Sequence, residues 1–323
     1  MRQRLTCEWI EHLAVSFLFY DTCAIERCCM ASKKITFVDL FAGIGGFHLA
    51  FHNLGAKCVF VSEWDEPARQ TYKANFENME PELFAPKNVD KLFAGDITKV
   101  KAKEIPDFDI LTGGFPCQPF SQAGLKRGFN ETRGTLFFDI ARIIKEKQPS
   151  AFFIENVRGL LNHNDGQTFA TIKKVITKDL GYSFHYKVIF ASDFGVPQHR
   201  PRLYMVGFRD KKIKFEFPRP QELKMTMSDV FGGNAEKEVG YTLRVGGRGS
   251  KIDDRRNWEY YIVDNKVKRI SPKEGLKMQG FPDNFVFPVS EIQAMKQLGN
   301  SVAVPAVQAT AEQIIKALRK AKK

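Results

Sequence analysis

The chain has few cysteines, and their scarcity excludes two classes of protein. Of the 323 residues six are cysteine, and apart from Cys58 and Cys117 all of them lie within residues 1–30. Six cysteines are too few for a disulfide scaffold at this length. No Cys pair or Cys/His cluster has the spacing of zinc ligands. We therefore expect a cytoplasmic protein without a metal site.

Long hydrophobic runs are also missing. The apolar patch Leu13–Tyr20 is flanked by acidic residues and is too short to cross a bilayer. No clear signal-peptide cleavage site follows it. Met30 and the residues after it resemble a natural protein start just before the first strong strand. We expect residues 1–30 to be a dispensable N-terminal extension, and we expect no membrane association.

The charge of the chain is far from neutral. Lys and Arg total 49 against 37 Asp and Glu, which gives a net charge of +12 and a pI near 9.3. Such an excess favours a polyanionic partner, with nucleic acid ahead of an anionic membrane surface. A basic enzyme without any such partner is the alternative.

Strand-like and helix-like segments alternate along the body of the chain, which is typical of an α/β sheet covered by helices. Short apolar runs predict the strands, and apolar residues at helical spacing predict the helices. The predicted strands are Ile35–Phe41, Cys58–Ser62, Asp109–Thr112, Ala151–Ile154, Phe184–Phe190 and Leu203–Phe208, and the predicted helices are 47–54, Thr135–Lys147, Gln167–Leu180 and Val304–Leu318.

The character of the sequence changes near residue 218. From there to residue 269 apolar periodicity fades while Gly, Arg and Lys become frequent. Order returns after Ile270. We expect a large domain over residues 31–217, a small basic domain over 218–269, and a return to the large domain over 270–323.

A glycine-rich turn follows the first predicted strand. Glycines in the segment Asp39–Gly46 let the backbone approach a ligand at the start of a helix. The spacing differs from the G-x-G-x-x-G fingerprint, which argues against a nicotinamide or flavin. Glu63 and Trp64 end the second strand, where a carboxylate suits ribose hydroxyls and an indole suits an adenine face. With Asp96 after the next strand-like segment, they predict a pocket for an adenosine-bearing cofactor.

Cys117 lies on a Gly/Pro-rich turn directly after the predicted strand Asp109–Thr112. A thiol at such a turn is either a nucleophile or a small buried hydrophobe. Glu155 follows another strand at the same architectural level and could act as an acid or hydrogen-bond donor. Arg200 and Arg202 are two residues apart, so both face one side of an extended segment, where they could brace a carboxylate or contact phosphate.

In chain order these blocks resemble the DNA (cytosine-5) methyltransferases of bacterial restriction–modification systems. The resemblance covers roughly residues 35–215 and 270–320, and residues 1–30 match nothing in the family pattern. The matching blocks are Asp39–Gly43, Gly114–Gln118, Glu155–Val157, Gln198–Arg202 and Gly299–Val302.

The resemblance implies a Rossmann-like, S-adenosylmethionine-dependent methyltransferase domain with a mixed sheet, plus a small basic target-recognition domain. It implies that Cys117 attacks C6 of a flipped cytosine and that Glu155 hydrogen-bonds the N3 and N4 edge of the ring. Arg202 then holds the ring, and Arg200 supports the site. The cofactor residues implied by the family are Phe41, Gly43, Gly45, Glu63, Trp64, Asp96, Ile97, Pro116, Asn300 and Ser301.

The implied partner is duplex DNA that carries a short specific target. Arg133, Arg244 and Arg248 are the predicted DNA contacts, with Arg244 and Arg248 placed against guanine edges of a GC-rich palindrome. The loop Ser121–Arg133 is expected to close over the flipped base.

The implied role is protection of this target from a cognate restriction endonuclease, by a protein that acts as a monomer. Two alternatives stay open at this point: a tRNA cytosine-5 methyltransferase, and a catalytically silent nucleic-acid-binding module. A dedicated recognition segment favours DNA, and the presence of Cys117 and Glu155 argues against the silent module.

Overall fold

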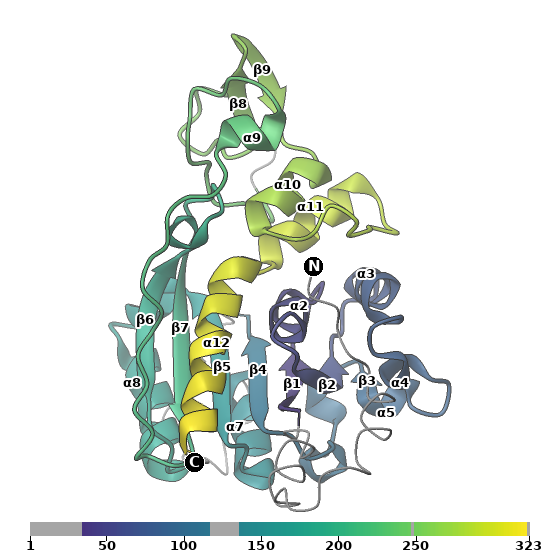
Figure 1. Ribbon diagram of the computed structural model, residues 1–323, viewed down its shortest axis with the longest axis vertical. Helices are drawn as coiled ribbons and strands as arrows, with labels where there is room; N and C mark the ends of the chain where they lie inside the picture. The colour runs from purple at the N-terminus through teal and green to yellow at the C-terminus, as the bar shows by residue number, and fades with distance from the viewer. Residues whose placement is uncertain (1–33, 117–135, 247–248, 322–323) are drawn as a thin grey trace, which may run out of the picture. The chain divides into compact units, whose positions relative to one another are not determined.

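The computed structural model describes residues 34–116, 136–246 and 249–321 (Figure 1). Residues 35–323 form one compact unit. Cys117, Arg133, Arg248 and the loop Ser121–Arg133 lie outside the described residues. In the described part of the chain, no helix is long and apolar enough to span a membrane.

A seven-stranded mixed sheet forms the centre of this unit, in the order β3-β2-β1-β4-β5-β7-β6. Strands β1 to β5 are parallel, whereas β7 runs antiparallel to both β5 and β6. The mixed α/β sheet confirms the predicted fold class. The strands are β1 (Thr36–Leu40), β2 (Lys57–Ser62), β3 (Phe93–Ala94), β4 (Ile110–Gly114), β5 (Ala151–Val157), β6 (His185–Phe190) and β7 (Pro201–Phe208).

Helices cover both faces of the sheet, and the alternation of side chains along each strand explains the two apolar cores. In β1, Phe37 belongs to one core while Val38 and Leu40 belong to the other. The first core is closed by α2 (Gly46–His52), α3 (Glu66–Phe76) and α12 (Val304–Ala321), and the second by α7 (Leu136–Lys147) and α8 (Gln167–Lys174). Helix α8 continues into one π-helical turn at Val175–Asp179.

The largest difference from the predicted strand boundaries concerns β5. The strand expected over Ala151–Ile154 continues to Val157, so Glu155 lies inside β5 rather than after it. The reason is that β7 pairs with β5 through Val157, beyond the last residue of β4. An antiparallel neighbour can prolong the ladder in this way because its hydrogen bonds do not depend on where β4 ends.

Most of the remaining elements follow β7 in the chain. Helix α9 (Met227–Phe231) and the hairpin of β8 (Tyr260–Val263) and β9 (Lys266–Arg269) form a small group beyond the end of the sheet (Figure 1). Helices α10 (Pro272–Gln279) and α11 (Glu291–Asn300) connect this group to α12. Two short helices, α4 (Pro81–Phe84) and α5 (Val89–Leu92), precede β3.

The chain leaves β1 toward β2 and β3, and later enters β4 and β5 on the other side of β1. The parallel strands on the two sides of this point end at the same edge of the sheet. Open α/β sheets bind ligands at such a switch point, in the crevice outside the carboxyl ends of the strands. The topology thus locates the candidate site before any side chain is considered.

Gly45 carries a testable prediction for stability. Its φ is +86°, and a Cβ at this position would lie 2.2 Å from the Phe76 ring. That ring is buried and is stacked on His48 with a centroid distance of 4.2 Å. We expect Gly45→Ala to lower the free energy of unfolding by roughly 2–4 kcal/mol, from backbone strain and overpacking together.

Gly43 provides the matched control, because its φ is +55° but no atom lies within 4 Å of the added Cβ. Gly43→Ala should cost only the strain, roughly 1 kcal/mol. Urea unfolding of both variants without ligand measures the difference. Equal losses in the two proteins would contradict the packing argument.

Candidate active site

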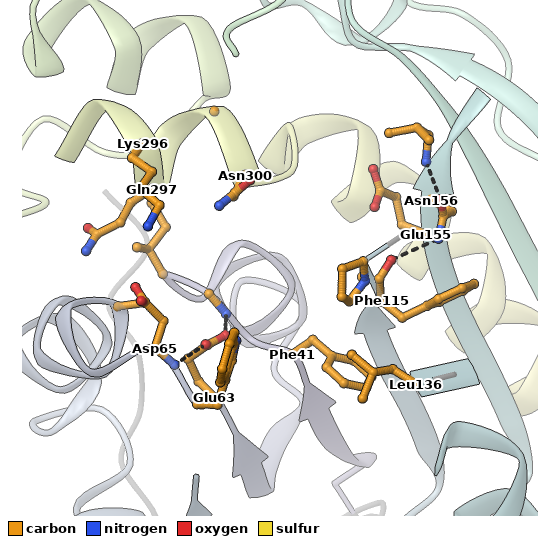
Figure 2. A pocket seen from close by; sticks show the side chains of 18 of the residues that line it. Phe41, Glu63, Asp65, Phe115, Leu136, Glu155, Asn156, Lys296, Gln297 and Asn300 are labelled. Carbon is orange, nitrogen blue, oxygen red and sulfur yellow. Dashed lines mark hydrogen bonds between the residues drawn. The ribbon is translucent and has the colours of Figure 1, made fainter. Parts of the chain in front are cut away.

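A cavity of about 480 Å³ lies at the switch point, outside the ends of β1, β2, β4 and β5 (Figure 2). One wall comes from the glycine-rich turn and the end of β2, another from β4, β5 and β7, and a third from α11. The cavity is lined by Phe41, Gly43, Ile44, Glu63, Trp64, Asp65, Ala68, Gly114, Phe115, Pro116, Leu136, Glu155, Asn156, Val157, Arg202, Lys296, Gln297, Gly299 and Asn300.

The glycine-rich turn bends away from β1 through three residues with positive φ: Phe41, Gly43 and Gly45. Phe41 has a φ of +56° and Gly43 one of +55°. A non-glycine residue in this region costs of order 1–3 kcal/mol, and such strain concentrates at binding sites. The turn is held to β2 because the Ala42 N–H donates to the carbonyl of Ser62 at 3.0 Å. The backbone at Gly43 therefore faces the cavity with no side chain in the way.

Glu63 lies at the end of β2 and is almost completely buried. One of its carboxylate oxygens accepts from the Gly43 N–H at 2.7 Å, and the other accepts from the Asp65 N–H at 2.8 Å. Burial raises the pKa of this carboxyl, and the two backbone donors partly offset that effect. Each carboxylate oxygen has a second lone pair, so Glu63 is held in place and can still accept from a ligand hydroxyl.

Three groups in one wall of the cavity fit an adenosine-bearing cofactor: the Glu63 carboxylate, the face of the Trp64 indole and the accessible backbone at Gly43. Trp64 lines the cavity and is 77% exposed, which leaves its indole free to stack on a purine. Asn300 and Lys296 enter from α11 on another side (Figure 2). Together with Glu63 and Gly43, these groups suit an adenosine moiety.

Not every predicted cofactor residue lines this cavity. Phe41, Gly43, Glu63, Trp64, Pro116 and Asn300 do, and the structure brings them together. The other four lie outside it. Gly45 makes room for Phe76, and Ile97 is buried in the second core. Asp96 accepts from the N–H and hydroxyl of Thr98, and the Ser301 carbonyl accepts from Arg200.

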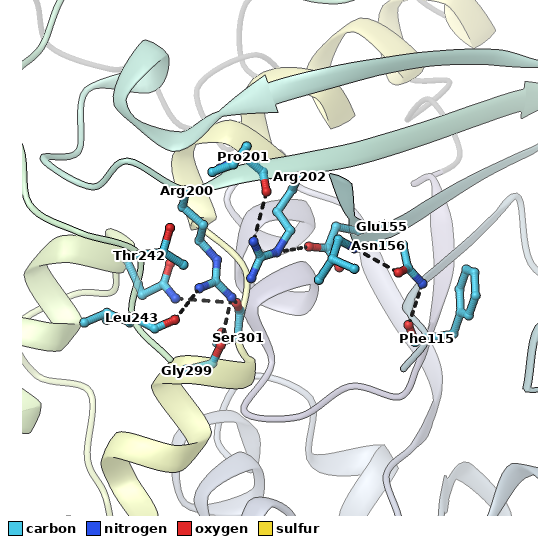
Figure 3. A network of polar contacts seen from close by, with 12 residues as sticks. Phe115, Glu155, Asn156, Arg200, Pro201, Arg202, Thr242, Leu243, Gly299 and Ser301 are labelled. Carbon is cyan, nitrogen blue, oxygen red and sulfur yellow. Dashed lines mark hydrogen bonds and ion pairs between the residues drawn. The ribbon is translucent and has the colours of Figure 1, made fainter. Parts of the chain in front are cut away.

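Glu155 lies on the opposite side of the cavity (Figure 2), and its buried carboxylate forms an ion pair with the partly buried Arg202 (Figure 3). Arg202 lies across from Val157 in the β5–β7 ladder, so its side chain shares a face with Glu155. Its Nε lies 2.9 Å from the Glu155 Oε1. Burial raises the pKa of the Glu155 carboxyl, and the charges of Arg202 and Arg200 oppose that rise. This carboxyl therefore keeps a proton to higher pH than an ordinary glutamate.

Arg200 is fully buried beside this pair but bonds elsewhere (Figure 3). Its guanidinium donates to three backbone carbonyls, those of Leu243, Gly299 and Ser301. The sequence predicted two arginines on one face, and the structure confirms that arrangement. The two side chains have different partners. Arg202 pairs with the Glu155 carboxylate, whereas Arg200 links the chain at Leu243 to the end of α11.

The turn that leads to Cys117 is fixed by Asn156. Its Nδ2 donates to the Phe115 carbonyl at 2.8 Å, and its Oδ1 accepts from the Val157 N–H at 2.9 Å. Gly114 lies so close to Glu155 that a Cβ there would be 3.2 Å from the Glu155 Oε2. Pro116, the last described residue of this turn, lines the cavity. Cys117 is thus the next residue in the chain after a residue of the cavity wall.

Some lining residues had no role in the sequence interpretation. Asp65 is the residue after Trp64, Leu136 opens α7, and Asn156 lies within a recognised block. Lys296 and Gln297 lie on α11. They precede the predicted cofactor residue Asn300 by four and three residues, a spacing that places side chains on one face of a helix and could have identified both. The backbone role of Asn156 has no comparable sequence signal.

Of the predicted DNA contacts, only Arg244 falls within the described residues. It is exposed and directly follows the buried Leu243. Its side chain is therefore accessible from outside, while the chain just before it is anchored in the core.

Comparison with known proteins agrees with this geometry. The chain is 44% identical over 319 residues to the Type II methyltransferase M.SsoII of Shigella sonnei, covering 87% of this chain and 80% of that protein. It is 41% identical to the Type II methyltransferase M.HpaII of Haemophilus parainfluenzae, with 88% and 90% covered. The fold also resembles the crystal structure of the S. pombe Dnmt2 methyltransferase, with a TM-score of 0.66, 18% identity, and 88% and 99% of the chains covered.

Residues 35–245 and 238–316 match the C-5 cytosine-specific DNA methylase family. The match spans the sheet, the cavity and the helices up to α12. Together with the relatives above, it shows that this chain belongs to the C-5 cytosine-specific DNA methylase family.

Proposed function

We propose that this chain methylates C5 of a cytosine within a short specific sequence of duplex DNA, with S-adenosylmethionine as the methyl donor. The observation that carries the proposal is the shared cavity. Glu63 and the glycine-rich turn line one side of it, and the Glu155–Arg202 pair lines the other. The turn that leads into Cys117 lies in the same wall.

Six residues of the wall would hold the cofactor. Glu63 accepts the ribose hydroxyls, Trp64 stacks on the adenine, and Phe41, Gly43, Pro116 and Asn300 complete the wall. Gly45, Asp96, Ile97 and Ser301 would act from behind this layer by fixing the turns on which it rests. Bound S-adenosylmethionine supplies an electrophilic methyl group.

Carbon 5 of cytosine is a weak nucleophile, which is why the chain needs a thiol. The Cys117 thiolate adds to C6, and the ring becomes an enamine in which C5 is electron-rich. After C5 has gained its methyl group, loss of the C5 proton and departure of the Cys117 thiolate restore the aromatic ring. Carbon 6 is inaccessible inside a duplex, so the cytosine must leave the stack first.

Glu155 and Arg202 would stabilise the ring while the thiol is attached. A protonated Glu155 donates a hydrogen bond to N3 and thereby draws electron density away from C6. Burial raises the pKa of this carboxyl, and that direction favours the protonated form which the role requires. Arg202 orients that carboxyl through the 2.9 Å contact and holds the flipped ring.

The DNA partner is inferred from charge and from the recognition segment. The excess of 12 positive charges favours phosphate contacts, which give affinity without sequence preference. Arg133, Arg244 and Arg248 are the proposed specific contacts. Arg244 and Arg248 belong to the proposed target-recognition domain over residues 218–269.

We also propose that the methylation protects this target from a cognate restriction endonuclease, as the names of the Type II relatives suggest. The protein would act as a monomer in the cytoplasm, where bacterial DNA lies.

Replacement of Cys117 tests the chemistry directly. Cys117→Ala should lower kcat for methyl transfer to DNA by at least about a thousandfold, because the attacking thiol is lost. Bisulfite sequencing of DNA from cells that express each protein identifies the target and checks the loss. Cys58→Ala is the matched control, since Cys58 is buried in β2 away from the cavity.

The same assay distinguishes the acceptor. Labelled methyl groups should pass to duplex DNA and not to tRNA. Transfer by Cys117→Ala at the parent rate would refute the thiol mechanism, and transfer to tRNA alone would refute the DNA substrate.

Glu155 should give the activity an alkaline limit. The carboxyl acts in its protonated form, so kcat/KM is expected to fall as the pH rises through the raised pKa of Glu155. Glu155→Gln should lower kcat/KM about 100-fold and remove this limit. A pH–rate profile of both proteins is the measurement, and an unchanged alkaline limb in the variant would contradict the assignment.

Glu63 should determine cofactor affinity. Glu63→Gln is expected to raise the Kd for S-adenosylhomocysteine about tenfold or more, because one charged acceptor is lost from the wall. Calorimetric titration measures this Kd. Glu66→Gln is the control, because Glu66 pairs with Arg69 on α3 outside the cavity. A similar change in both variants would point to a general effect of charge.

A further inference from the structure

The middle of the proposed recognition domain (residues 218–269) packs against Gly299 of the cavity wall. Gly299, near the end of α11, is buried and lines the cavity. A Cβ at Gly299 would lie 2.6 Å from the carbonyl carbon of Arg244, 2.7 Å from its oxygen and 2.8 Å from the Val245 nitrogen. These are backbone atoms, which cannot move aside as a flexible side chain can. The chain at Arg244 therefore approaches α11 as closely as a glycine permits.

Arg200 ties the same two segments together from the side (Figure 3). One guanidinium nitrogen donates to the Leu243 carbonyl at 3.0 Å, and another donates to the Gly299 carbonyl at 2.9 Å. The second nitrogen also donates to the Ser301 carbonyl. Arg200 is only 2% exposed, so these charge-assisted bonds form away from water, where they are strong.

Gln198 completes the attachment of Leu243. Its Oε1 accepts from the Leu243 N–H at 3.0 Å, and its Nε2 donates to the Met278 carbonyl at 2.9 Å. Both backbone polar groups of Leu243 are therefore held by buried side chains from one extended segment. Gln279 holds the end of α11 in turn, by donating to the Leu298 carbonyl at 2.8 Å.

We propose that Gly299 and Arg200 are positioning residues for target recognition, which set the backbone of Leu243–Val245 against the cofactor wall and thereby couple cofactor binding to DNA binding. The proposal rests on the proposed function and adds to it the physical link between the two sites. Arg244 is exposed immediately beyond the anchor, so a displacement of this backbone moves the side chain that faces DNA.

The link has a definite sign. A cofactor seated against Gly299 and Asn300 favours the arrangement of α11 in which Arg200 reaches both carbonyls. DNA that contacts Arg244 favours the same arrangement from the other side. Two ligands that favour one arrangement bind with positive coupling, and each must raise the affinity for the other by the same factor.

The test measures that factor with S-adenosylhomocysteine and a fluorescent duplex that carries the target mapped by bisulfite sequencing. In the parent protein, saturating S-adenosylhomocysteine should lower the Kd for the duplex about tenfold. In Gly299→Ala the factor should fall to about one, whatever the Kd for S-adenosylhomocysteine alone becomes, because the factor is the ratio of the duplex Kd values without and with saturating S-adenosylhomocysteine. The ratio of affinities for the target and for a duplex with one substituted base pair should also fall.

Gly159→Ala is the matched control, because a Cβ at Gly159 meets no atom within 4 Å. Its coupling factor should equal that of the parent. Arg200→Lys provides a second route to the answer if Gly299→Ala does not fold: the positive charge is kept, but one ammonium cannot reproduce the planar three-carbonyl contact, and the factor should again fall.

A parent without coupling, or a coupling factor unchanged in both Gly299→Ala and Arg200→Lys, would overturn the proposal. Failure of the proposed function is a separate result, since it would appear as a parent that transfers no methyl group to DNA.

Discussion

A carboxylate removed from water must be paired or protonated, and the architecture around Glu155 follows from that constraint. Arg202 meets it from β7, which must run antiparallel to β5 for its first residues to lie at the edge where the parallel strands end. The mixed sheet is therefore more than a variation in topology. It brings a strand start and several strand ends to one edge, so that Glu155, Arg202 and the turn before Cys117 share a single cavity.

Arg200, the residue immediately before β7, is a fully buried cation, and its surroundings show how burial selects partners. Arg200 has no carboxylate of its own, and its charge is met by the dipoles of three carbonyl groups. Those carbonyls come from segments far apart in the chain. The Arg200 guanidinium thus fastens the chain at Leu243 to the end of α11, whereas Arg202, two residues away, pairs with the Glu155 carboxylate in the cavity. Proximity in sequence does not imply a common task.

The sequence predicted six of the seven strands of the main sheet and the helices α2, α7, α8 and α12 because these depend on local patterns; it did not predict β3, α3 or α11. Apolar runs marked β1, β4 and β5, and the Glu63 and Glu155 carboxylates stood out as strand-end acids. The length of β5 could not be predicted, since it depends on pairing with β7. The roles of Gly45 and Gly299 could not be predicted either, because each depends on one distant contact, with Phe76 and with Arg244 respectively. Cys117 was singled out by sequence alone, and the structure describes the turn that leads to it.

The close approach at Gly299 has a consequence for the exchange of sequence between relatives. A recognition segment from another methylase is often regarded as a cassette defined by its base-contacting side chains. In this chain the exchangeable segment is also constrained by its backbone. Its residues Leu243–Val245 must contact Gly299 closely, and the Leu243 carbonyl must accept a hydrogen bond from Arg200. A transplanted segment whose backbone follows a different course at these positions would present the correct specificity residues in the wrong place. An exchangeable unit must therefore begin before Leu243, because the Leu243 N–H is bound by the Gln198 side chain.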